Sequence, residues 1–90
     1  MKAVRVHYEG RVQGVGFRWA ARNLAMEYDV SGTVKNLPDG RVELVARGDG
    51  EEVDDFLTAI ADSALAGHIT SAHQEEIELP EAPRGFQIVP

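Results

Sequence analysis

The sequence predicts an α+β fold in which an antiparallel sheet is covered on one face by two helices and is followed by a short extra strand. Stretches in which apolar and polar residues alternate, as in half-buried strands, flank stretches in which apolar residues recur at helical spacing. Their order along the chain is strand, helix, strand, strand, helix, strand, and turn-forming residues separate them.

The first strand and the first helix are predicted from these two patterns. Over residues 4–12, Val4, Val6 and Tyr8 alternate with charged or polar residues, which gives the strand one apolar face. Glycines then mark a loop, and helical spacing predicts a helix from residue 18 to about residue 29. The apolar positions of this helix are Ala21, Leu24, Ala25 and Tyr28.

A hairpin and a second helix follow. Residues 31–37 and 41–48 are rich in β-forming residues and are separated by a Pro-Asp-Gly sequence, which is typical of turns that join antiparallel strands. The second helix is predicted over residues 50–65. Asp49 is its expected N-cap, and Glu52 is expected to reach back to it.

The last part of the chain predicts two more strands. Residues 69–79 have β character but alternate poorly, which indicates a bulge or a shifted register, and residues 85–89 predict a short last strand. The complete order is that of the ferredoxin-like βαββαβ sandwich with a trailing strand. Because this arrangement hosts many unrelated activities, function has to be argued from particular residues.

Length, charge and cysteine content exclude several functions. Ninety residues allow one domain, predicted over residues 1–90. A net charge of −6 disfavours nucleic acid and anionic membrane surfaces as partners. The N-terminus alternates charged and apolar residues, unlike a signal peptide or a spanning helix, so we expect a cytoplasmic protein. The chain has no cysteine, which removes disulfides, thiolate metal sites and cysteine nucleophiles.

The remaining charges favour an anion over a metal as the ligand. Residues 1–22 hold five basic residues and one acidic residue, a local charge of +4, whereas residues 23–90 carry −10. An anion would prefer the first of these segments, unless the clustering is chance on a solvated surface. His7, His68 and His73 are scattered without metal-ligand spacing, so we expect neither a metal nor a cofactor.

The glycine-rich loop at residues 13–18 is the first candidate for an anion site. A loop between a strand and a helix can aim several backbone N–H groups and the positive end of the helix dipole at one anion. Gly14 and Gly16 would let the ligand approach, although a tight connection would also explain them. Arg18 favours the anion site, because a cation in the first helical turn opposes the helix dipole and a bound phosphoryl group would reverse that penalty.

Asn36 is the second candidate. A right-handed crossover makes the first two strands parallel, so the second strand ends at the same end of the sheet as the glycine-rich loop. Asn36 shares the helix-covered face with Val34, and roughly 10 Å separates it from the first strand if the third strand lies between them. An asparagine here could simply prepare the next turn, but its carboxamide could also hold a water in line with a phosphorus atom.

These residues resemble those of the acylphosphatase family. Residues 10–18, GRVQGVGFR, match the family signature G-x-V-Q-G-V-x-[FM]-R, and residues 32–36, GTVKN, match part of a second signature. Tyr8 stands where the family prefers an aliphatic residue, and Thr33 stands where it prefers an aromatic one. We expect these two departures to alter packing beside the site without removing a functional group. Three further residues of the second signature are present: Gly40, Val42 and Gly48.

The resemblance implies a role for each candidate residue. Arg18 would bind the phosphoryl group, and Asn36 would position the attacking water. The other ligands of the phosphate would be backbone N–H groups of the loop. These donors would be Gly14, Val15, Gly16, Phe17 and Arg18.

The resemblance also implies the activity, which is hydrolysis of the carboxyl–phosphate bond of small acyl phosphates to a carboxylate and inorganic phosphate. Water would attack directly, because no cysteine is available to form a phosphoenzyme. The leaving carboxylate, whose conjugate acid has a pKa of about 4, needs no protein acid. An alternative is a non-catalytic or carbamoyl-phosphate-handling acylphosphatase-like binding domain. We expect a monomer that works without a metal or a cofactor.

Overall fold

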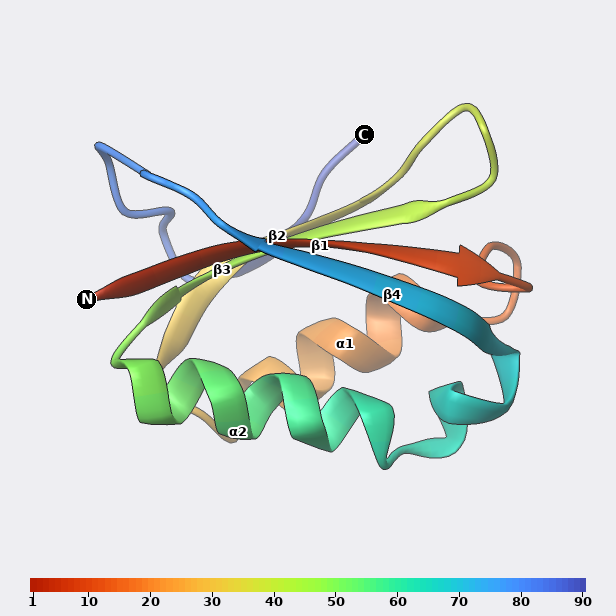
Figure 1. Ribbon diagram of the computed structural model, residues 1–90, viewed down its shortest axis with the longest axis horizontal. Coiled ribbons are helices and arrows are strands. Elements are labelled where there is room, and N and C mark those ends of the chain that lie inside the picture. The colour runs from red at the N-terminus through yellow and green to blue at the C-terminus, as the bar shows by residue number, and fades with distance from the viewer.

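The computed structural model describes residues 1–90. Two helices cover one face of a five-stranded sheet, and the other face is open (Figure 1). The strands are β1 (Lys2–Gly10), β2 (Val30–Asn36), β3 (Val42–Gly48), β4 (Ile69–Glu76) and β5 (Phe86–Ile88). The helices are α1 (Phe17–Ala25), α2 (Gly50–Ala61) and the short 3-10 helix η1 (Ala64–His68). No helix is both long and apolar enough to cross a membrane.

The strand order β4-β1-β3-β2-β5 places β3 between β1 and β2. β3 is antiparallel to both neighbours, so β1 and β2 run in the same direction and end at the same end of the sheet. This confirms the ferredoxin-like α+β fold predicted from the sequence. The sheet is mixed rather than wholly antiparallel, because the short β5 pairs parallel to β2.

The alternating pattern of the strands builds the core. Every second residue of β3 is buried, and so is every second residue of β1 from Val4 to Tyr8. With side chains from α1 and α2 and with Val12, Val34 and Leu65, these side chains form one cluster of 15 buried residues, and no charged or polar residue is buried among them. The ring of Phe56 on α2 lies 5.4 Å from that of Phe86, which attaches β5 to this core.

Both helices are shorter than their periodicity predicts. α1 ends at Ala25, and turn residues follow it instead of a further helical turn. α2 ends at Ala61 because Ser63 stops it. The Ser63 hydroxyl donates to the carbonyl of Ile60 at 2.7 Å and accepts from the N–H of Leu65 at 3.1 Å, which begins η1.

The start of α2 and the pairing of β4 also differ from the expectation. Asp49 is the N-cap residue of α2, as predicted, but its side chain makes no cap hydrogen bond, so the predicted reciprocal contact with Glu52 is wrong. Glu52 instead accepts a hydrogen bond from the backbone N–H of Asp29 at 2.8 Å, which joins α2 to the chain that enters β2. The expected irregularity of β4 is confirmed at its first residues, where the register shifts between Glu9 and Gly10 of β1.

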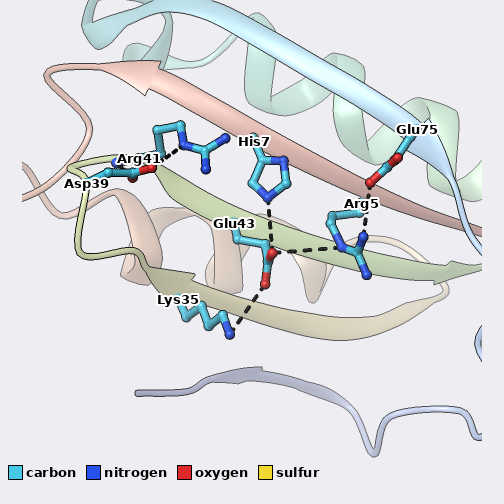
Figure 2. Close-up of polar contacts among 7 residues, drawn as sticks. All are labelled: Arg5, His7, Lys35, Asp39, Arg41, Glu43 and Glu75. Carbon is cyan, nitrogen blue, oxygen red and sulfur yellow. Dashed lines mark hydrogen bonds and ion pairs between the residues drawn. The ribbon is translucent and has the colours of Figure 1, made fainter.

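Charged side chains cross the open face of the sheet (Figure 2). The carboxylate of Glu43 lies 3.0 Å from Nε2 of His7 and 3.5 Å from Nζ of Lys35. Arg5 lies 3.8 Å from Glu43 and 3.0 Å from Glu75 on β4. Burial opposes ionisation of Glu43, but the hydrogen bond to His7 and the charge of Lys35 outweigh it and lower the pKa of this carboxyl.

We expect Glu43 to stabilise the fold near neutral pH and to lose that contribution in acid. A lowered folded-state pKa gives stability that is present above the unfolded pKa and lost as the pH falls through the folded value. Glu43→Gln should therefore lower the melting temperature at about pH 7 and lower it less at about pH 3. Thermal unfolding over this range measures the effect, with Glu81→Gln, at an exposed residue outside every ion pair, as the control. An equal loss at both pH values would contradict it.

Candidate active site

The loop between β1 and α1 has a backbone shape that favours glycine. Gly14 and Gly16 have φ angles of 78° and 79°, in the left-handed region that other residues rarely adopt. Nothing lies within 4 Å of the place that a Cβ would take at either residue. Backbone conformation rather than crowding therefore selects glycine here, and the space beside the loop is open.

This loop presents backbone donors that the chain itself does not use. No N–H group of residues 12–16 donates a hydrogen bond within the chain. The next N–H groups belong to the first turn of α1, where a helix offers no acceptor. Such a row of donors at the positive end of a helix dipole can hold an anion. The five predicted donors lie in this row: Gly14, Val15, Gly16, Phe17 and Arg18.

Arg18 is the second residue of α1 and is half-buried. The first turn of α1 contains no acidic residue, and Arg18 takes part in no ion pair. Its charge therefore opposes the helix dipole without compensation from the chain. A phosphoryl group would supply the missing negative charge and could accept two hydrogen bonds from the guanidinium.

Asn36 is the last residue of β2. It shares the helix-covered face with the buried Val34, as the alternation of the strand predicts. Its Oδ1 atom is buried and has no hydrogen-bond partner in the chain, and no other buried side-chain oxygen or nitrogen lacks one. Leaving such an acceptor unpaired costs about 1–3 kcal/mol, so a partner from solvent or a ligand is expected.

The loop and the end of β2 meet at one end of the sheet (Figure 1). The side chain of Gln13 joins them: its Nε2 donates to the carbonyl of Leu37 at 2.8 Å and to the carbonyl of Arg41 at 3.0 Å. The residue before Gly14, the first predicted donor, is thus bonded to the residue after Asn36. The sequence alone assigns no role to Gln13 beyond its place in the family signature, because its partners are 24 and 28 residues away.

The two departures from the family signatures have different surroundings. Tyr8 is buried, its ring lies 4.9 Å from that of Phe17, and burial raises the pKa of its hydroxyl. It therefore supports the first residue of α1. Thr33 alternates with the buried Gly32 and Val34 and so lies on the open face. Thr33 is therefore on the opposite face of β2 from Asn36, and its effect on packing beside the site stays a prediction.

Together these groups can bind a small anion and hold a water beside it. The unpaired N–H groups and Arg18 provide positive charge and donors, while the Asn36 carboxamide can both accept from and donate to a water. No group of three or more histidine, aspartate or glutamate side chains is placed to hold a metal ion.

The fold and the site define a ferredoxin-like α+β protein whose β1–α1 loop presents unpaired backbone donors. Known proteins share this fold and resemble the chain in sequence. The acylphosphatase family profile matches residues 4–88. The chain is 40% identical over 90 residues to an acylphosphatase of Lactobacillus johnsonii, with 99% of each covered. It is 36% identical to the Bacillus subtilis acylphosphatase in its crystal structure, with a TM-score of 0.88 and 99% of each chain covered. It is also 32% identical to T. kodakarensis HypF, with a TM-score of 0.87, but covers only 12% of that chain. The chain belongs to the acylphosphatase family.

Proposed function

We propose that this acylphosphatase hydrolyses the carboxyl–phosphate bond of small acyl phosphates with Arg18, the loop N–H groups and Asn36 as its site. One observation carries the assignment of these residues. The buried Oδ1 of Asn36 has no partner in the chain, and Asn36 ends its strand at the end of the sheet where the loop presents unpaired donors. This geometry supports a water held beside a bound phosphoryl group.

The reaction needs one bond to form and one to break at phosphorus. The water oxygen attacks in line as the bond from phosphorus to the carboxyl oxygen breaks, and the carboxylate leaves with the bonding electrons. The proton of the water passes to a phosphate oxygen of the substrate, since the proposed site contains no carboxylate or histidine. A leaving group whose conjugate acid has a pKa of about 4 departs without a protein acid at neutral pH.

The protein contributes charge and position. Arg18 and the loop N–H groups would hold the equatorial oxygens, on which negative charge is spread in the transition state. Asn36 would fix the direction of attack by hydrogen bonding the water. The entropy cost of orienting the water is then met on binding and not in the chemical step. Because Arg18 and Asn36 come from α1 and β2, both side chains are carried by elements that pack into the core.

We expect hydrolysis to proceed without a divalent metal. Phosphate release from an aryl acyl phosphate should continue at the same rate when a chelator is present, because positive charge at the site comes from Arg18 and backbone donors. The measurement is a phosphate-release assay with and without the chelator, and after adding back Mg²⁺. Loss of turnover with the chelator and its return with Mg²⁺ would contradict this proposal. Phosphate binding with no turnover at all would favour the alternative of a non-catalytic binding domain.

A monomeric state is part of the proposal, supported by a core that is complete within one chain. Cytoplasmic location and the lack of a nucleic-acid partner stay predictions. Their basis is the charge and the N-terminal pattern of the sequence.

A further inference from the structure

We propose that Gln13 is a positioning residue that holds the phosphoryl-binding loop in register with Asn36. This inference rests on the roles proposed above for the loop and for Asn36. Gln13 itself needs no contact with substrate, because its carboxamide nitrogen is engaged by the backbone of the β2–β3 turn.

The contacts of Gln13 form a short path between the two halves of the site. Its Nε2 carries two hydrogens, and each has an acceptor, the carbonyl of Leu37 at 2.8 Å and that of Arg41 at 3.0 Å. Gly14, the first proposed donor of the loop, follows Gln13 in the chain, and Leu37 follows Asn36. The side chain of Gln13 therefore connects the proposed phosphate ligands of the loop to the segment that carries Asn36.

The β2–β3 turn, to which Gln13 is bonded, is stabilised by its own hydrogen bonds. The N–H of Leu37 donates to the carbonyl of Arg41 at 2.8 Å, and the N–H of Gly40 donates to the carbonyl of Leu37 at 3.2 Å. The carboxylate of Asp39 accepts from the backbone N–H of Arg41 at 3.1 Å and from its Nε at 2.8 Å (Figure 2). Because this turn cannot shift easily, it gives the loop a fixed reference point.

The loop between β1 and α1 makes few other hydrogen bonds to the rest of the chain. Among residues 11–18, Gln13 is the only side chain that makes a hydrogen bond, and the backbone N–H of Arg11 makes one to the carbonyl of His68 on the other side of the loop. In-line attack is sensitive to displacements of about 1 Å, which can cost about 100-fold in rate. Loss of the Gln13 contacts should therefore disturb the chemical step more than the binding of phosphate.

Gln13→Met tests this inference, because methionine keeps the length of the side chain and removes its donors. Each carbonyl keeps a backbone donor, so the fold should survive, and assays are run below the melting temperature of each protein. We expect kcat for an aryl acyl phosphate to fall about 10- to 100-fold, while the inhibition constant of inorganic phosphate changes less than about 3-fold. Gln13→Asn should show the same changes as Gln13→Met, because the asparagine side chain is too short to reach both carbonyls. Gln87→Met is the matched control, because Gln87 also donates to a carbonyl, that of Arg84 at 2.9 Å.

A double-mutant cycle separates this role from a general loosening of the loop. If Gln13 acts through Asn36, Gln13→Met should change kcat less than about 3-fold when Asn36 is already alanine. An equal loss of kcat in both backgrounds, or a parallel rise in the phosphate inhibition constant, overturns the inference. If Gln13→Met keeps a parent-like kcat while Asn36→Ala is impaired, the role of Gln13 is overturned but the proposed role of Asn36 stands. Parent-like kcat in Asn36→Ala overturns the proposed role of Asn36, and this inference with it.

Discussion

Arg18→Ala is expected to lower kcat/KM for an aryl acyl phosphate at least about 100-fold, the usual cost of removing one transition-state donor. The guanidinium is the only side-chain cation in the first turn of α1, and no group of the chain competes for it. Both KM and the inhibition constant of inorganic phosphate should rise, because ground-state and transition-state oxygens lose the same partner. Arg18→Lys keeps the charge but not the two-pronged donor, so it should recover only part of the activity.

Stability distinguishes a lost ligand contact from a damaged fold. Because Arg18 opposes the dipole of α1, Arg18→Ala should leave the free energy of unfolding unchanged or raise it by up to about 1 kcal/mol. Arg22→Ala is the control, since Arg22 stands in the last turn of the same helix, where a cation complements the dipole. It should be slightly less stable and fully active. Parent-like kcat/KM in Arg18→Ala, or an Arg22→Ala protein as inactive as Arg18→Ala, would refute the assignment.

The strands could be predicted from the sequence because burial of one face imposes alternation locally. The predicted bounds of β1, β2 and β3 agree with the structure within two residues. The ends of the helices could be predicted less well from the sequence. Nothing in the periodicity shows that the Ser63 hydroxyl closes α2, or that Glu52 accepts from Asp29 rather than from its own helix, since both depend on where neighbouring backbone lies.

The residues proposed for the site could be predicted from the sequence to different degrees. Arg18 and Asn36 each break a local rule, a cation at a helix start and an asparagine in a strand, and such conflicts mark functional positions. Gln13 breaks none. Its partners on the β2–β3 turn come near it only when the sheet has formed, so its contacts could not be deduced from the pattern of residues along the chain.

Asn36→Ala is expected to lower kcat at least about 100-fold while the inhibition constant of inorganic phosphate changes less than about 3-fold. The loop and Arg18 remain to bind phosphate, but no carboxamide directs the water. The free energy of unfolding should stay the same or rise, because the substitution removes a buried oxygen that has no partner in the chain. Steady-state kinetics, phosphate inhibition and thermal unfolding measure these three quantities. Asn23→Ala, the same substitution on α1 at an asparagine whose side chain makes no hydrogen bond, should match the parent in kcat.

Asn36→Asp separates positioning from charge at the same atom. Aspartate keeps the size and an acceptor oxygen but loses the donor and adds a negative charge on the helix-covered face, toward the bound dianion. Phosphate inhibition should therefore weaken together with kcat in Asn36→Asp, whereas in Asn36→Ala only kcat should fall. If both variants kept parent-like kcat, the water would need no direction from β2, and the unpaired Oδ1 would have to be explained by solvent alone. If Asn36→Asp left phosphate inhibition unchanged, the carboxamide would lie too far from the anion to aim anything at it.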